Sequence, residues 1–223
     1  MKQTRLLRTL LAAVCLFVGT SAWAVDYLTT NTGVVGAADN SSGFNTKGSK
    51  SMSLAAGDEY VITFVNNNKG ASGTEYWDNW AFCSNVFNCR ADHGASNPYW
   101  GNATNVNYTG NSWTDISSTI SEWLQAYNGV TVTLTVSRNA VGDGITVSHT
   151  ATTKAINTIA SQTYEGIFTA TVGASAEINF YLTCEDSHLS IIKVVKNGAQ
   201  FSYLSSESAY TDQSNSTTNY EIT

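Results

Sequence analysis

Alternation of apolar and hydroxyl-bearing residues is the clearest pattern in this chain. From Val130 to Ser137, valine or leucine alternates with threonine or serine without a break. Successive side chains of a strand point to opposite faces, so this pattern predicts a strand with one buried and one solvated face. Similar alternation at residues 60–64 and 178–184 predicts two more strands of this kind.

Turn-forming residues separate several of these segments. Gly142, Asp143 and Gly144 lie between the strand at 130–137 and a further alternating segment at 145–148, which predicts a β-hairpin. Another strand is predicted at about residues 189–195. The asparagine-rich residues 66–70 and the pair Asn197-Gly198 are predicted turns or loops.

One segment has helical spacing instead. Its apolar residues recur every three or four positions, with Asp115 available as a cap before them and Gly129 just beyond. These residues are Ile116, Ile120, Trp123, Leu124 and Tyr127. They predict one short helix near 115–127, with Trp123 in the core. Many short strands and one helix indicate a mostly β fold, a two-sheet antiparallel β-sandwich.

The two ends of the chain have different compositions from its middle. Lys2, Arg5 and Arg8 precede an apolar run at 10–18, and small residues at Ala22 and Ala24 predict signal-peptide cleavage after Ala24. The apolar run is much shorter than the roughly 20 residues that span a bilayer. We therefore expect a signal peptide at 1–24, a β-sandwich domain at 25–198 and a Ser/Thr-rich tail at 199–223, poorly ordered or a linker. The mature protein would be secreted, periplasmic or on the cell surface, without membrane insertion.

Charge limits the partners of the mature chain. The sequence has 11 basic and 17 acidic residues, and removal of the three basic signal-peptide residues leaves 8 and 17, a net charge of −9. An acidic protein is repelled by nucleic-acid phosphates and by anionic lipid surfaces, so neither is an expected partner.

Three cysteines remain after cleavage: Cys83, Cys89 and Cys184. Cys83 and Cys89 flank five residues and could form a disulfide across a hairpin, which export would permit. The alternative is that all three are small buried hydrophobic residues. Their spacing does not fit a zinc site.

Several short motifs, taken in order, resemble a known family. They are Thr63-Phe64-Val65-Asn66, Trp77-Asp78-Asn79-Trp80, Arg90-Ala91-Asp92, Trp100-Gly101, the strand at 130, and Phe180-Tyr181-Leu182-Thr183 with Ser187-His188-Leu189. This order resembles the jelly-roll β-sandwich domains of secreted and surface proteins of glycan-degrading bacteria, which are carbohydrate-binding-module-like. The resemblance covers about residues 50–196 and implies a jelly-roll sandwich. The chain departs from the family in its short, cysteine-flanked loop between Trp80 and Arg90, and we expect no catalytic domain attached to the sandwich.

Aromatic and polar residues are interleaved between Tyr76 and Trp113. Sugar rings stack on flat aromatic side chains, and their hydroxyls need polar partners. We therefore expect a ligand-binding site with an aromatic platform of Trp77, Trp80, Tyr99 and Trp100, and with Arg90, Asp92 and Asn102 as polar partners.

Structural roles compete with this interpretation. Tryptophan is often buried, and Trp77 and Trp80, three apart on a strand, point to opposite faces. Arg90 and Asp92 share a strand face, so they could form an ion pair that orders the loop or clamp a sugar hydroxyl. His149 aligns with the apolar face of its strand.

Three functions stay open. Non-catalytic binding of polysaccharide or oligosaccharide ranks first, a structural or adhesive surface protein with a protein partner second, and an unrecognised glycoside hydrolase or polysaccharide lyase third. The enzyme interpretation is less favoured, because the adjacent pairs Asp58-Glu59 and Glu185-Asp186 do not resemble the two carboxylates across a glycosidic bond, and there is no nucleophile elbow.

No cofactor is expected. A structural calcium ion stays open, with oxygen ligands from Asp39, Asn40, Asp143, Glu185 or Asp186, although no spacing matches a known calcium loop.

Overall fold

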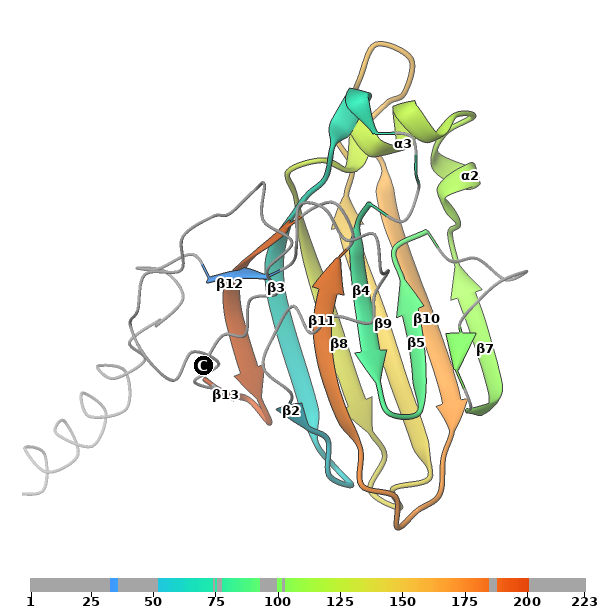
Figure 1. The fold of residues 1–223 in the computed structure, drawn as a ribbon, viewed down its shortest axis with the longest axis vertical. Helices are drawn as coiled ribbons and strands as arrows, with labels where there is room; N and C mark the ends of the chain where they lie inside the picture. The colour runs from blue at the N-terminus through green and yellow to red at the C-terminus, as the bar shows by residue number, and fades with distance from the viewer. Residues whose placement is uncertain are drawn as a thin grey trace, which may run out of the picture.

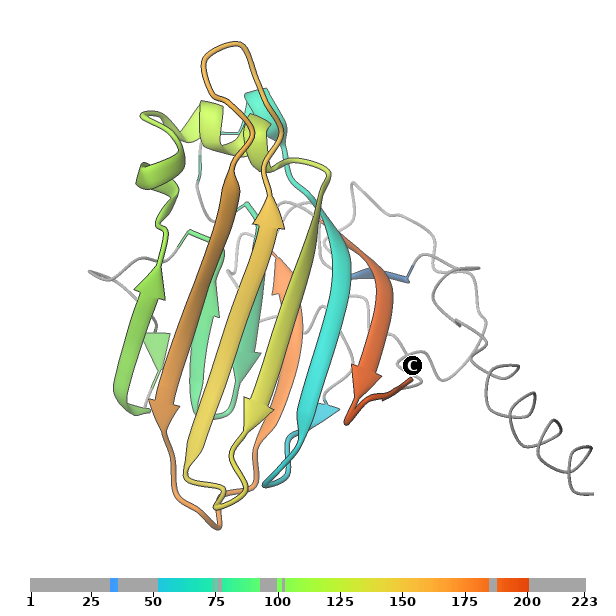
Figure 2. The same cartoon turned by 180° about the vertical axis from the view of Figure 1, so that it is seen from behind.

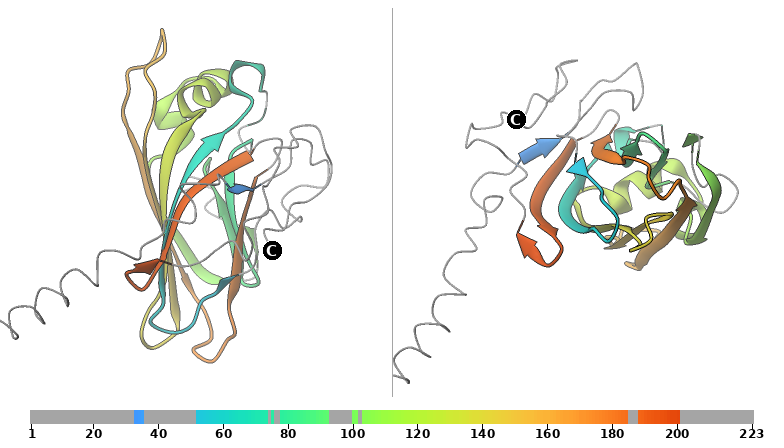
Figure 3. Two further views of the ribbon diagram at one scale, coloured as in Figure 1. Left: turned by 90° about the vertical axis from the view of Figure 1, so that its left-hand side faces the viewer. Right: turned by 90° about the horizontal axis from the view of Figure 1, so that it is seen from below.

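The chain folds as a mostly β structure with two facing antiparallel sheets (Figures 1 and 3). This computed structural model describes residues 33–35, 52–73, 75, 78–92, 100–101, 103–184 and 188–200. The predicted two-sheet sandwich is therefore confirmed, while the jelly-roll connectivity stays a prediction. The predicted signal peptide and most of the predicted tail lie outside the described residues.

The larger sheet contains the long alternating segments of the sequence. Among the described residues it has eight strands, in the order β1-β12-β3-β8-β9-β10-β7, with β13 paired to β12. They are β1 (Gly33–Val35), β3 (Glu59–Asn67), β7 (Thr104–Gly110), β8 (Val130–Arg138), β9 (Gly144–Thr152), β10 (Thr163–Thr171), β12 (His188–Lys196) and β13 (Ala199–Gln200). The predicted β8–β9 hairpin is confirmed. β13 extends past the boundary predicted at residue 198.

The smaller sheet lies in front of the larger one in Figure 1. Its order among the described residues is β2-β11-β4-β5-β6. The strands are β2 (Met52–Ser53), β4 (Trp80–Ser84), β5 (Phe87–Arg90), β6 (Trp100–Gly101) and β11 (Asn179–Cys184).

Two short helices at one end of the sandwich replace the single helix predicted near 115–127 (Figure 1). They are α2 (Trp113–Ile116) and α3 (Ile120–Tyr127), and a 3-10 turn, η2 (Gly70–Ser72), lies beside α3. Ser117 is extended, and its hydroxyl accepts a hydrogen bond from the backbone N–H of Thr119. Thr119 then caps α3 by accepting from the N–H of Glu122. Short hydroxyl side chains that bond the local backbone interrupt helices in this way.

The core between the sheets is rich in aromatic rings. Its largest fully buried side chains are Trp80, Trp123, Tyr60, Tyr127, Tyr164, Phe64, Phe82, Phe87, Phe168 and Phe180. The prediction that Trp123 belongs to the core is confirmed. Large aromatic side chains contribute much of the apolar area that a domain of this size can bury.

Asn66 links the two sheets inside this core. Its side-chain oxygen accepts from the backbone N–H of Trp80 at 3.0 Å, and its amide donates to Asn79 Oδ1 at 2.7 Å. The prediction of a turn beginning at residue 66 is therefore wrong for its first two residues, because β3 continues through Asn67. A buried amide needs such partners, so these bonds fix where β4 sits against β3.

The predicted Cys83–Cys89 disulfide is not formed. Cys83 lies opposite Asn88, and Cys89 lies opposite Phe82. The two side chains therefore point to opposite faces of the smaller sheet, Cys89 into the main core and Cys83 beside Ala81 and Tyr181. Both are buried, as in the alternative interpretation, and burial raises the pKa of the Cys83 thiol to about 12.

Candidate functional site

The outer face of the larger sheet carries a regular array of hydroxyl groups. The face is turned toward the viewer in Figure 2. Its outward positions on β8, β9 and β10 are Thr131, Thr133, Thr135, Ser137, Gly144, Thr146, Ser148, Thr150, Thr152, Thr163, Glu165, Ile167, Thr169 and Thr171. All are Ser or Thr except Gly144, Glu165 and Ile167. The alternation in sequence produces this face, because the apolar residues between these positions point into the core.

Strand register aligns these side chains in rows across the sheet. Thr133 pairs with Thr150, which pairs with Glu165. In the next row, Thr135 pairs with Ser148, Ser148 with Ile167, and Ile167 with Thr109 of β7. Neighbours within a row are about 4.8 Å apart, since this is the spacing of strands in a sheet.

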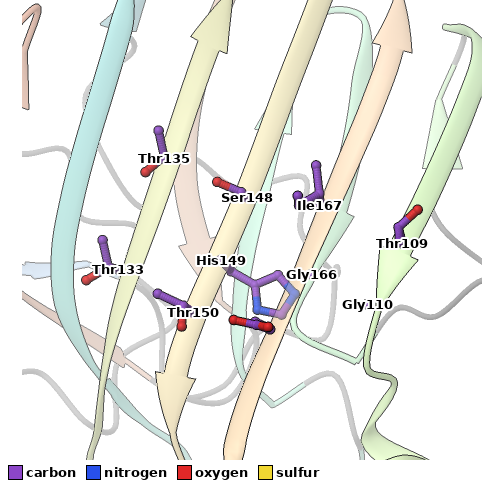
Figure 4. Close-up of a pocket in the computed structure, with 10 residues that line it drawn as sticks. Thr109, Gly110, Thr133, Thr135, Ser148, His149, Thr150, Gly166 and Ile167 are labelled. Atoms are coloured by element: carbon purple, nitrogen blue, oxygen red, sulfur yellow. The ribbon is translucent and has the colours of Figure 1, made fainter.

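A shallow open cavity of about 390 Å³ lies between the two rows, and we call it the hydroxyl trough (Figure 4). Its walls are Thr133, Thr150 and Glu165 on one side and Thr135, Ser148, Ile167 and Thr109 on the other. Its floor includes the backbone at His149, Gly166 and Gly110, which are paired across β9, β10 and β7. The trough therefore runs across the strands, not along them.

Two glycines shape the β10–β7 end of the trough. A Cβ on Gly166 would overlap the hydroxyl of Tyr108, and a Cβ on Gly110 would overlap the backbone of β10. Gly110 also has a φ of +143°. Because neither glycine has a side chain, the two strands approach closely and the ring of Tyr108 fits beneath them.

His149 lies directly under the trough, with its ring in the core. It is 3% exposed and packs against Trp80 and Tyr164, with ring centroids 5.3 and 5.0 Å away. Within the described part of the chain, neither ring nitrogen has a hydrogen-bond partner. Burial lowers the pKa of His149 to about 3, so the ring is neutral at physiological pH.

The structure corrects one member of the predicted aromatic platform. Trp80 is fully buried, and its indole N–H donates to the hydroxyl of Tyr127 at 2.9 Å. It cannot stack on an external sugar, so the prediction of ligand contact for Trp80 is wrong. Trp77, Tyr99 and Asn102 lie outside the described residues. Trp100 is placed only by its backbone, which belongs to β6 and pairs with Asn88 of β5.

Arg90 and Asp92 form the ion pair expected of a structural role. Arg90 Nε and Asp92 Oδ1 are 2.6 Å apart, and the side chains are 17% and 4% exposed. Burial raises the pKa of Asp92 to about 6, although the nearby Arg90 opposes the shift. The pair lies at the end of β5, on the smaller sheet, so the structure does not place it beside the hydroxyl trough.

Only part of the pattern that forms the trough can be recognised from the sequence. The hydroxyl alternation of β8 is visible in the sequence, but β10 was not predicted. Its apolar face is interrupted by Gly166, between Tyr164 and Phe168. The trough depends on the register of four strands, β7, β8, β9 and β10, and the sequence of a single strand does not determine its register with its neighbours.

The described residues contain no group of three or more His, Cys, Asp or Glu side chains placed to hold a metal ion. Of the calcium ligands considered above, Asp143 accepts a hydrogen bond from Asn139 at 2.7 Å. Asp39, Asn40, Glu185 and Asp186 are not among the residues described.

Comparison with known proteins gives no family for this chain. No protein-family model matches it, and no curated protein sequence matches it either. The resemblance to sandwich domains of glycan-degrading bacteria therefore stays a prediction from the sequence motifs. In the part of the chain that the structure covers, no helix is long and apolar enough to cross a membrane.

Proposed function

We propose that this protein binds carbohydrate without catalysis, and that it does so at the hydroxyl trough. The observation that carries the proposal is the pair of registered hydroxyl rows that face each other across an open trough. The aromatic platform expected from the sequence is not needed for this site.

The chemistry of the trough suits a sugar polymer. Each Ser or Thr hydroxyl can donate one hydrogen bond and accept two, which matches the mixed donor and acceptor character of sugar hydroxyls. Ile167 is 46% exposed and offers an apolar surface to the C–H face of a ring. Because the trough is open, a long chain could enter and leave without an end being threaded, and water could bridge imperfect contacts.

Two other functions have less support at this site. Glycoside hydrolysis uses two carboxylates, whereas Glu165 is the one carboxylate among the residues that line the trough. Adhesion to a protein through a broad apolar patch is less favoured because, over the described residues, the exposed large hydrophobic side chains are Val141 and Ile167. The proposal includes export, which rests on the signal-peptide pattern of residues 1–24.

Removal of hydroxyls from the trough tests the proposal. The variant combines Thr133→Val, Thr135→Val and Thr150→Val, which keep side-chain shape and favour strands. A net hydrogen bond contributes about 0.5–1.5 kcal/mol, so we expect binding to weaken by about tenfold or more. Binding is measured by isothermal titration calorimetry of the mature protein against a panel of soluble plant, algal and host polysaccharides.

The matched control lies on the same sheet face, with one substitution on each of β8, β9 and β10. Thr131→Val, Thr152→Val and Thr163→Val remove three hydroxyls from a neighbouring row that does not line the trough. We expect affinity within about twofold of the wild type, since these hydroxyls do not face the ligand. Equal losses in both triple variants, or a folded wild type that binds none of the polysaccharides, would contradict the proposal.

A further inference from the structure

The walls of the hydroxyl trough differ in charge. Glu165 lies on one wall, and the other lining residues are hydroxyl-bearing, apolar or glycine, apart from the buried and neutral His149. Glu165 is exposed. Its backbone is held by two hydrogen bonds with Asn111, one from the N–H of Asn111 to the carbonyl of Glu165 and one from the N–H of Glu165 to Asn111 Oδ1. A carboxylate is thus held at the wall of an otherwise uncharged site.

A basic side chain on the same face is too far away to neutralise it. Lys193 is exposed and lies at the β12 end of the same row, beyond Thr63, Thr133 and Thr150. Four strand spacings separate it from Glu165, about 19 Å at about 4.8 Å each. That separation exceeds the Debye length of about 8 Å at physiological ionic strength, so the charge of Lys193 is largely screened at the trough.

The direction of the trough determines which parts of a polymer approach Glu165. Because the rows run across the strands, an extended chain in the trough crosses β8, β9 and β10 in turn. A sugar residue in an extended polymer advances by a distance close to one strand spacing. About three consecutive sugars therefore lie over these strands, at about 4.8 Å per strand. The sugar over β10 lies beside the carboxylate, whichever repeat of the polymer occupies that position.

We propose that Glu165 makes the hydroxyl trough selective for neutral glycans and excludes polymers that carry carboxylate or sulfate groups along their chain. This inference rests on the proposed function. A polyanion would bring a like charge beside Glu165 whatever its register in the trough, whereas a neutral chain can use the carboxylate as a hydrogen-bond acceptor.

Matched pairs of polymers test this selectivity. The pairs are hydroxyethyl cellulose with carboxymethyl cellulose, galactan with polygalacturonate, and mannan with polymannuronate. Titration calorimetry at 20 mM and 300 mM NaCl compares the wild type with Glu165→Gln. For a pair whose neutral member binds, we expect the acidic member to bind the wild type at least about fivefold more weakly at low salt. This difference in affinity should be smaller at high salt, because exposed charges are screened.

Glu59→Gln is the matched control. Glu59 is an exposed carboxylate on the same sheet face, on β3, and does not line the trough. The difference in affinity between the neutral and the acidic member of a pair should narrow to less than about twofold in Glu165→Gln. In Glu59→Gln it should stay as large as in the wild type. Equal wild-type affinity for both members of a pair, or a difference that survives in Glu165→Gln, would overturn the inference while leaving carbohydrate binding intact. If the folded protein binds no neutral and no acidic polymer, the proposed function itself fails and the inference fails with it.

Discussion

At the scale of single residues, His149 shows how a polar group can be kept in an aromatic core. Its ring is enclosed by Trp80, Tyr108, Tyr164 and Phe168. The enclosure excludes water, and burial lowers the pKa from 6.5 in the unfolded chain to about 3. The titratable neighbours Tyr108 and Tyr164 have raised pKa values, so they remain neutral in the acidic range.

This burial predicts a loss of stability in acid. Between pH 6.5 and 3 the unfolded state binds a proton at His149 that the folded state does not, so the free energy of unfolding falls as the pH falls through this interval. His149→Phe removes the titrating group and keeps an aromatic ring. From pH 7 to pH 5, we expect the wild type to lose about 2 kcal/mol relative to the variant, because one pKa unit corresponds to about 1.4 kcal/mol. Urea denaturation at several pH values measures the difference.

The prediction would be contradicted if the difference in the free energy of unfolding between the wild type and His149→Phe did not change with pH. It would mean that the ring of His149 reaches water or a hydrogen-bond acceptor in solution.

At the scale of secondary-structure elements, Arg138 connects the turns at the end of the sandwich opposite the helices. It is 5% exposed, and its guanidinium donates to five backbone carbonyls. The acceptors are Leu54, Gly142, Gly173, Ala174 and Ala176, at 2.9 to 3.3 Å. The side chain thus joins the segment before β3, the β8–β9 turn and the loop from β10 to β11.

Replacement of Arg138 should weaken all three connections. Arg138→Lys keeps the charge but loses the planar group that reaches several carbonyls at once. A buried polar group left unsatisfied costs about 1–3 kcal/mol, so we expect a loss of roughly 2–4 kcal/mol in the free energy of unfolding, measured by chemical denaturation at pH 7. Val141→Ala, at a 70% exposed position of the same turn, is the control and should change stability by less than about 0.5 kcal/mol. An Arg138→Lys protein as stable as the wild type would show that these bonds do not hold the turns.

Sequence reasoning succeeded where the signal lies within one element. β3, β8, β9 and β11 alternate over several residues, so each was predictable, as was the core position of Trp123 on the apolar face of α3. The failures depend on how elements pair and pack with one another, which no single element shows. Trp80 is buried because Tyr127 and His149 pack on it, and Cys83 and Cys89 diverge because of the register between β4 and β5. The trough could not be predicted for the same reason, since it needs β7, β8, β9 and β10 in register.

At the scale of the whole molecule, two buried titratable groups have opposite effects on how the free energy of unfolding depends on pH. Asp92 is associated with the smaller sheet, and its carboxyl has a pKa raised from 3.8 to about 6, chiefly by burial. Between these values the folded state binds more protons than the unfolded state, so this group increases the free energy of unfolding as the pH falls through that interval. His149, in the larger sheet, acts in the opposite direction over an overlapping range.

The overall pH profile should therefore depend on both groups. In the wild type their contributions offset each other between about pH 6 and pH 4. Asp92→Asn removes one contribution and should make the protein lose stability more steeply in acid, by about 1–2 kcal/mol relative to the wild type over this interval. His149→Phe should give the opposite slope, and the double variant should return to the wild-type slope, because it lacks both of the contributions that offset each other in the wild type. Thermal and urea denaturation of the four proteins from pH 7 to pH 4 give these differences directly, and contributions of other carboxylates such as Asp58 cancel in the comparison.

If Asp92→Asn instead made stability less sensitive to acid, Asp92 would be ionised more easily in the folded state than in the unfolded chain, and the pairing with Arg90 would outweigh the effect of burial.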